Sequence, residues 1–235
     1  MASPHSKNPT GGSGNRADYQ AAFLQRVHRL LQLAYESLTP ADYETSEEDD
    51  ITGDLCRHMN FLTEVAPAER WMARFAVKDQ DPSNDVPCAV TGRIRKGKRR
   101  PKIDIRIVCK HLTPNRGYCI EAKRLYRSDS VSEYTNDEGV GAFVCGDYAT
   151  NDDFGGMLGY VQVDAIEKWL PKIESKLQRR PDLQLNRDGK VWGSMNFRRG
   201  PKVCFASRHR RDSGREICLI HVMLAFRGAS KRTGE

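Results

Sequence analysis

Acidic and basic side chains lie on two short apolar segments in a pattern that could support hydrolytic chemistry. In Lys102–Cys109, isoleucines alternate with Asp104 and Arg106, which is the period-two pattern of a half-buried strand. A cluster of turn residues, Thr113–Gly117, follows this segment. Alternation then resumes in Tyr118–Ala122, so we expect a second strand that returns along the first. Asp104 is therefore predicted to face away from the core.

Glu121 and Lys123 are predicted to share one face of the second strand, because they are two residues apart. If the strands pair, both side chains converge with Asp104 on one polar patch. Neighbouring carboxylates favour a bound cation, and Mg²⁺ or Mn²⁺ takes oxygen ligands while leaving positions for water and a phosphate. Lys123 could then orient or activate the attacking water, or offset charge that develops on the phosphate. The alternative interpretation is an ordinary solvated strand face.

This arrangement resembles the PD-(D/E)xK nuclease superfamily, which includes many restriction enzymes and repair nucleases. Pro101 and Asp104 correspond to the family's proline–aspartate pair with two residues inserted, and Glu121-Ala122-Lys123 matches its Glu-x-Lys motif. The resemblance covers the segment from Pro101 to Lys123. It implies an α/β fold with a central mixed β-sheet flanked by helices, a restriction-endonuclease-like core, and a catalytic set that includes Asp104, Glu121 and Lys123.

A third carboxylate is expected from an acidic run that precedes a helical apolar pattern. In the resembled superfamily, the helix before the sheet often lends a carboxylate to the metal site. Glu48 is the preferred residue in this setting, with Glu47 and Asp50 as alternatives, so the predicted metal ligands are Glu48, Asp104 and Glu121. The other interpretation is that the acidic residues only stabilise the first turn of the helix.

The charge of the chain favours a polyanionic partner. The 235 residues carry a formal net charge of +7, and Lys and Arg gain affinity by releasing counterions from phosphate. Two basic segments are predicted to contact nucleic acid, although a solvated face is the alternative for each. Their residues are Arg95, Lys96, Lys98, Arg99 and Arg100 in the first, and Arg208, Arg210 and Arg211 in the second.

These features predict a Mg²⁺-dependent endonuclease that hydrolyses the phosphodiester bonds of DNA. An RNA endonuclease with the same site is an alternative, because nothing in the sequence reads the sugar. Another alternative is a non-cleaving nucleic-acid-binding subunit of a larger assembly. The run Gly159–Gln162 is similar to bacterial nuclease-like proteins found among anti-phage defence genes, which suggests restriction or antiviral defence. A partner ATPase, helicase or other defence subunit and a homodimer are compatible with the sequence.

Cysteine usage and hydropathy indicate the compartment. The seven cysteines form no Cys-x-x-Cys pair, so we expect reduced thiols in a cytoplasmic protein and no zinc site. No apolar run approaches the ~20 residues that span a bilayer, and no secretory signal is recognised.

The domain organisation is predicted to be a disordered tail over residues 1–16 and a single nuclease-like domain over residues 17–235 with an N-terminal helical extension. From Ala17 to Leu38, apolar residues recur at helical spacing, which indicates an amphipathic packing helix. A dimer face is the alternative function for this helix. The segment Val65–Val90 contains a short strand or helix around Phe75.

A second long helix is predicted to follow Asn151-Asp152-Asp153, because apolar residues from Leu158 to Trp169 lie three and four positions apart. Three glycines would fall in its first turns, and Pro171 would kink or restart it. Gln162 is then expected on the helix surface, with a contact to the site as the alternative.

Two strands are predicted in the C-terminal third, Val203–Ser207 and Ile217–Phe226, joined by the basic loop Arg208–Arg215. His221 lies inside an apolar run and is expected to be a hydrogen-bonded core histidine. His209 is expected to be more exposed.

Overall fold

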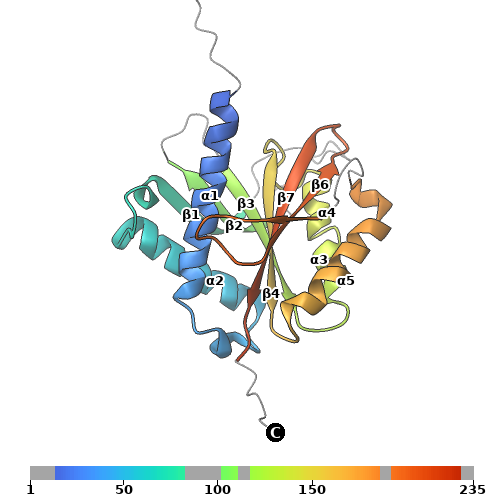
Figure 1. Ribbon diagram of the computed structural model, residues 1–235, viewed down its shortest axis with the longest axis horizontal. Helices are drawn as coiled ribbons and strands as arrows, with labels where there is room; N and C mark the ends of the chain where they lie inside the picture. Colours follow the sequence, from blue (N-terminus) through green and yellow to red (C-terminus); the bar gives the residue numbers. More distant parts are fainter. Residues whose placement is uncertain (1–13, 83–101, 111–116, 186–191, 229–235) are drawn as a thin grey trace, which may run out of the picture.

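A single mixed β-sheet runs through the part of the chain that the computed structural model describes, residues 14–82, 102–110, 117–185 and 192–228 (Figure 1). In these ranges the sheet has seven strands in the order β1-β2-β3-β4-β7-β6-β5. The strands are β1 (Phe75–Pro82), β2 (Lys102–Cys109), β3 (Gly117–Leu125), β4 (Phe154–Val161), β5 (Gly193–Met195), β6 (Cys204–Arg210) and β7 (Glu216–Ala225). The α-helices are α1 (Gly14–Glu36), α2 (Glu48–Asn60), α3 (Ser130–Thr135), α4 (Val140–Val144) and α5 (Ile166–Arg179).

Parallel pairing is confined to the middle of this sheet. β4 lies parallel to β3 on one side and to β7 on the other. β1 and β2 continue from β3 in antiparallel order, and β6 and β5 continue from β7 in the same way. Central parallel strands are usually covered on both faces, and seven of the eight residues of β4 are buried.

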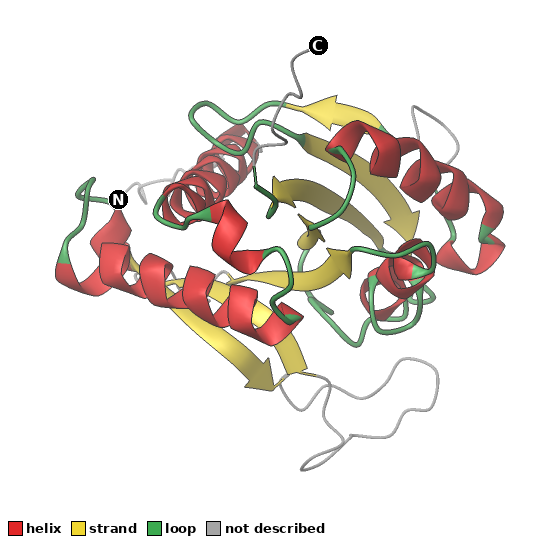
Figure 2. Ribbon diagram, turned by 90° about the horizontal axis from the view of Figure 1, so that it is seen from below, coloured by secondary structure: helices red, strands yellow, loops and turns green. Residues whose placement is uncertain are grey.

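Helices cover both faces of the sheet (Figure 2). On one face, α1 and α2 pack on a core that includes Ile105 and Ile120. On the other face, α3, α4 and α5 pack on a core that includes Cys119 and Met157. The expected architecture, α/β with a mixed sheet flanked by helices, is therefore confirmed. No helix in the described ranges combines the length and the apolar character needed to cross a membrane.

The predicted N-terminal helix is confirmed as α1, which begins at Gly14, three residues before the predicted start at Ala17, and ends at Glu36. Short helical turns follow α1 and α2: η1 (Pro40–Tyr43), η2 (Phe61–Val65) and η3 (Met72–Arg74), with η5 (Pro181–Leu183) after α5. The apolar residues that predicted α1 are all buried: Phe23, Val27, Leu30, Leu31, Ala34 and Leu38.

The helix predicted after Asn151 is wrong, because Phe154–Val161 is the central strand β4. A strand covered on both faces does not alternate between apolar and polar residues, so its pattern resembles that of a buried helix. Glycines let neighbouring side chains approach this strand closely. A Cβ on Gly155 would lie 2.6 Å from a Phe143 ring carbon, and a Cβ on Gly156 would lie 2.9 Å from the Tyr118 ring.

The helix in this region is α5, which begins only at Ile166 and continues through Pro171 to Arg179. Pro171 therefore neither ends nor restarts it. Proline has no N–H to donate to the carbonyl four residues earlier. That carbonyl belongs to the first turn of α5, so the lost hydrogen bond lies at the start of the helix. Packing retains the helix, because Trp169, Ile173 and Leu177 are buried along one stripe. The segment between β3 and β4 forms the two short helices α3 and α4.

The two predicted C-terminal strands are confirmed as β6 and β7, but β6 extends to Arg210 and shortens the basic loop. Arg211 is buried, and its guanidinium donates to five backbone carbonyls. These belong to Phe143, Tyr148, Ala149, Thr150 and Asp152. The prediction that Arg211 contacts nucleic acid is wrong, since its donors hold the segment between α4 and β4.

A buried chain of hydrogen bonds joins α3, β7, β6 and η5. The Leu183 carbonyl can only accept, so His209 Nδ1 donates to it at 2.7 Å. Burial lowers the pKa of His209 to about 4, so the ring is neutral and its Nε2 accepts from the Ser207 hydroxyl at 2.7 Å. Ser207 Oγ then accepts from His221 Nε2 at 2.7 Å, and His221 Nδ1 accepts from the Tyr134 hydroxyl at 2.9 Å. The expected core role of His221 is confirmed, whereas the exposure expected for His209 is wrong.

Substitution of Gly155 distinguishes a strand from a helix at this position, because the two structures predict opposite changes in the free energy of unfolding. We expect Gly155→Ala to lower the free energy of unfolding by about 1–3 kcal/mol, because the new methyl group must displace the Phe143 ring. In a helix the same change would stabilise the protein by up to ~1 kcal/mol. Urea denaturation followed by circular dichroism measures the difference. Gly193→Ala is the control, because a Cβ there has no heavy atom within 4 Å; stabilisation by Gly155→Ala would contradict the close packing of β4.

Candidate active site

The predicted hairpin brings Asp104 and Glu121 together where β2 and β3 separate. The two strands pair from Val108 opposite Gly117 to Ile105 opposite Ile120, and one further step would set Asp104 opposite Glu121. At this point the Asp104 side chain replaces the backbone as a partner, because its Oδ2 accepts from the Ala122 N–H at 2.8 Å. The two carboxylates therefore lie at the opening of the strand pair.

Both carboxylates are buried, so the prediction that they face solvent is wrong. Asp104 is 8% exposed and Glu121 is 4% exposed. The alternation in β2 and β3 indicated one apolar and one polar face, but α3, α4 and α5 cover the face that carries Glu121. Removal of a carboxylate here would change a buried hydrogen-bond network and not only a surface charge.

Lys123 links the hairpin to α2. Its Nζ donates to Glu121 Oε1 at 2.7 Å and to Glu48 Oε1 at 3.1 Å. Glu48 Oε2 accepts from the Arg124 backbone N–H at 3.1 Å. Of the three acidic residues considered on α2 and at its start, the structure therefore places Glu48 in the cluster. Glu47 is exposed and pairs with the Arg124 guanidinium, and Asp50 is exposed.

Gln162 fixes the start of α2 next to this cluster. Its Oε1 accepts from Arg124 Nε at 2.9 Å, and its Nε2 donates to the carbonyls of Tyr43 at 2.7 Å and Ser46 at 2.9 Å. Gln162 is buried directly after β4, so the expected position on a helix surface is wrong. It contacts the segment that positions Glu48 and is not bonded to the carboxylates themselves.

The buried charges shift one another's pKa values. Burial raises the pKa of Glu121 to about 8; the charge of Asp104 adds to the rise, and Lys123 opposes it. Burial also raises the pKa values of Asp104 and Glu48, again against the effect of Lys123. Burial alone would lower the pKa of Lys123, but Glu121, Glu48 and Asp104 together raise it. The cluster has three acidic groups and one ammonium, and it favours additional positive charge.

Two carboxylate oxygens fit the requirements of a divalent ion. Among the described residues, Glu121 Oε2 is buried without a hydrogen-bond partner, and Asp104 Oδ1 accepts a long bond of 3.4 Å from Gln80 Nε2. Mg²⁺ is commonly held by one or two carboxylates with water and phosphate oxygens completing its coordination. In the described ranges no three His, Cys, Asp or Glu side chains form a group with metal-ligand geometry. Both oxygens of Glu48 are already used by Lys123 and Arg124.

Two further residues beside the carboxylates were not identified from the sequence. Gln80 has a left-handed backbone, with φ of 46°, and interrupts the register between Asp79–Ile105 and Asp81–Ile103. The Tyr148 hydroxyl donates to the Lys102 carbonyl at 3.0 Å; burial raises the pKa of Tyr148, and Glu121 adds to the rise. No periodicity distinguishes either residue, because both positions depend on how distant segments meet.

The predicted basic contacts do not surround this cluster in the described part of the chain. Arg208 and Arg210 are exposed on β6, which β7 and β4 separate from β3. The first basic segment lies outside the described residues, as do Pro101 and most of the turn expected between β2 and β3: Arg95, Lys96, Lys98, Arg99 and Arg100 have no structural description here.

In comparisons with known proteins, no family model, no curated protein and no solved structure matches this chain. Any inference of function therefore depends on the residues of the cluster.

The raised pKa of Glu121 predicts how stability depends on pH in the presence of EDTA. The folded protein holds the Glu121 proton up to pH about 8, whereas an ordinary glutamate has a pKa of 4.5. The associated stability is full below pH 4.5 and is lost as the pH rises to about 8, by at most ~1.4 kcal/mol per pH unit. Glu121→Gln does not titrate, so we expect it to become more stable than the wild type as the pH increases.

Urea unfolding at pH 5, 6, 7 and 8 measures this difference. Glu138→Gln is the control, because Glu138 is exposed on the surface and its variant should follow the wild-type profile. Parallel profiles for the wild type and Glu121→Gln would contradict the raised pKa.

Proposed function

We propose that this protein is a metal-dependent nuclease that hydrolyses phosphodiester bonds in DNA. The observation that carries the proposal is the cluster of the buried Asp104 and Glu121 with the half-buried Glu48 and Lys123, in which Glu121 Oε2 has no hydrogen-bond partner among the described residues. Three acidic groups and a lysine in a water-poor site are costly for stability alone. Their types and order agree with the PD-(D/E)xK resemblance, which also implies a restriction-endonuclease-like core.

Asp104 and Glu121 are the proposed ligands of Mg²⁺ or Mn²⁺, and Glu48 is the third carboxylate of the set. A divalent ion supplies positive charge to the phosphate and favours deprotonation of the attacking water. The hydrogen bond from Ala122 N–H orients Asp104, and Gln162 and Arg124 fix the position of Glu48. Lys123 is held between two carboxylates, where its ammonium can stabilise negative charge on a bound phosphate.

Metal-dependent cleavage tests the proposal directly. With Mg²⁺ we expect the wild type to nick supercoiled plasmid, and we expect EDTA to abolish nicking. Asp104→Asn and Glu121→Gln should each lower the rate by at least about 10²-fold, because they remove ligand charge while retaining most of the side-chain volume. The same panel with labelled RNA determines whether DNA is the preferred substrate.

Asp50→Asn provides a matched control on α2, because Asp50 is exposed and lies outside the cluster. We expect it to cut at the wild-type rate. Mg²⁺ should also raise the melting temperature of the wild type and of Asp50→Asn but not that of Asp104→Asn. Wild-type cleavage by both Asp104→Asn and Glu121→Gln would remove the site assignment, and binding without cleavage by the wild type would favour a non-cleaving subunit.

A separate prediction concerns Lys123. Lys123→Ala should lower the single-turnover rate roughly 10²-fold, because the ammonium stabilises charge that develops in the transition state. Lys123→Arg should restore little, because a planar guanidinium cannot replace a compact ammonium between two carboxylates. The rate is measured at saturating enzyme, after circular dichroism has shown that each variant is folded. An unchanged rate in Lys123→Ala would restrict Lys123 to a structural role.

A further inference from the structure

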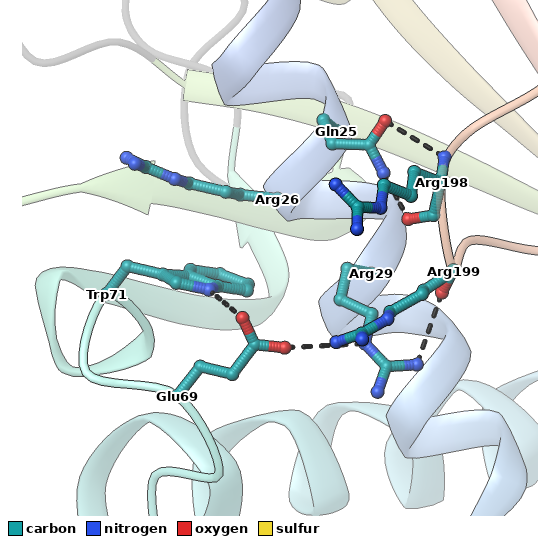
Figure 3. A pocket seen from close by; sticks show the side chains of 7 residues that line it. All are labelled: Gln25, Arg26, Arg29, Glu69, Trp71, Arg198 and Arg199. Atoms are coloured by element: carbon teal, nitrogen blue, oxygen red, sulfur yellow. Dashed lines mark hydrogen bonds and ion pairs between the residues drawn. The ribbon is translucent and has the colours of Figure 1, made fainter.

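An arginine-lined cavity lies between α1, the segment that precedes β1 and the segment between β5 and β6 (Figure 3). Its volume is about 260 Å³. It is separate from the carboxylate cluster and shares none of its residues. The lining residues are Gln25, Arg26, Arg29, Glu69, Trp71, Arg198 and Arg199. Four arginines and one glutamate give the cavity a net charge of +3, which favours an anionic ligand.

α1 holds the backbone of the segment that carries Arg198 and Arg199. Gln25 Oε1 accepts from the Arg198 N–H at 3.0 Å, and Gln25 Nε2 donates to the Arg198 carbonyl. Arg29 Nη1 donates to the Arg199 carbonyl at 3.2 Å. These bonds use the main chain of Arg198 and Arg199, whose side chains are exposed. Two guanidinium groups are thus presented from a fixed backbone.

The backbone at Arg199 is left-handed, with φ of 59°. Gly200 follows it and closes the turn, because the Gly200 N–H donates to the Phe197 carbonyl at 2.9 Å. A left-handed conformation costs a residue with a Cβ about 1–2 kcal/mol, and glycine would adopt it without this cost. The turn therefore retains an arginine where stability favours glycine.

Glu69 fixes the opposite wall of the cavity. Its Oε2 accepts from Trp71 Nε1 at 2.6 Å, and its Oε1 lies 3.6 Å from Arg29 Nε. Glu69 therefore offsets the charge of Arg29, whereas no ion pair is found for Arg26, Arg198 or Arg199 among the described residues. The Trp71 ring is partly exposed, with the Arg26 guanidinium carbon 5.9 Å from its centre. Such a ring offers a stacking surface for a nucleic-acid base.

We propose that this cavity binds a single strand of nucleic acid, with a phosphate held by Arg198 and Arg199 and a base placed against Trp71. The choice of nucleic acid as the polyanion rests on the proposed function. Guanidinium groups match phosphate oxygens with paired hydrogen bonds. The cavity is smaller than the ~300–1,000 Å³ of typical ligand pockets, and it suits one nucleotide unit. A base in a duplex is stacked on its neighbours and could not reach Trp71.

α1 connects the wall of the cavity to the central strands of the sheet. Tyr35 on α1 donates to the Ala225 carbonyl at 2.6 Å, and Ala225 is aligned through Val161 with Leu125, just beyond Lys123. α1 rises about 14 Å between Arg26 and Tyr35 at ~1.5 Å per residue.

Binding of a fluorescein-labelled single-stranded DNA oligonucleotide to the full chain in EDTA tests the proposal. Arg198→Glu should weaken binding by about tenfold or more at ~150 mM salt and lower the salt slope by about 0.7 for each phosphate that is no longer neutralised. Trp71→Ala should weaken it by at least about fivefold, as expected for one stacked base, and Trp71→Phe should retain most of the affinity. Lys202→Glu is the matched control, because Lys202 is exposed three residues after Arg199 and does not line the cavity.

We expect Lys202→Glu, which makes the same charge change as Arg198→Glu, to weaken binding by less than about threefold. Equal losses in these two variants would mean that only overall charge matters and would overturn the proposal. Failure of the wild type to bind the oligonucleotide at ~150 mM salt would also overturn it. Because EDTA prevents metal-dependent cleavage, these results are independent of the nuclease test. A protein that binds through Arg198 but never cuts would retain this cavity and lose the proposed function.

Discussion

The ammonium of Lys123 is the interaction on which the arrangement of the carboxylate cluster depends. It is shared by Glu121 of β3 and Glu48 of α2, and it compensates negative charge that burial would otherwise make too costly. Because Glu48 also accepts from the backbone of Arg124, the start of α2 is fixed to the end of β3. The same contact that assembles the cluster therefore holds a helix against the sheet, so that stability and the proposed chemistry would depend on one residue.

The sequence predicts those helices and strands that have one face packed on the core and the other face toward solvent, because such elements alternate between apolar and polar residues. The stripe from Phe23 to Leu38 predicts α1, and the alternation around Asp104 and Glu121 predicts the hairpin of β2 and β3. β4 was missed because both of its faces are covered and its glycines give no alternation. The alternation in β2 correctly predicted a strand but not the burial of Asp104, which depends on how distant segments, among them α2, meet around it.

Arginine content likewise shows what composition can and cannot predict. A positive net charge suggested exposed phosphate contacts, yet Arg211 is buried against carbonyl oxygens, and Arg124 is paired with Glu47 and Gln162. Arg198 and Arg199, which no sequence pattern singled out, project from a backbone that α1 fixes. The function of each arginine depends on which acceptors the fold brings within reach, and these lie far away in the sequence.

The chain of hydrogen bonds from Tyr134 through His221, Ser207 and His209 to Leu183 also affects the dynamics of the protein. Each side chain in it donates to the next group, ending at the Leu183 carbonyl, and its members come from α3, β7, β6 and η5. Displacement of one element would leave a buried donor or acceptor in another without a partner. These elements should therefore open as one cooperative unit in hydrogen exchange, so that the half of the sheet remote from the carboxylates behaves as a rigid support.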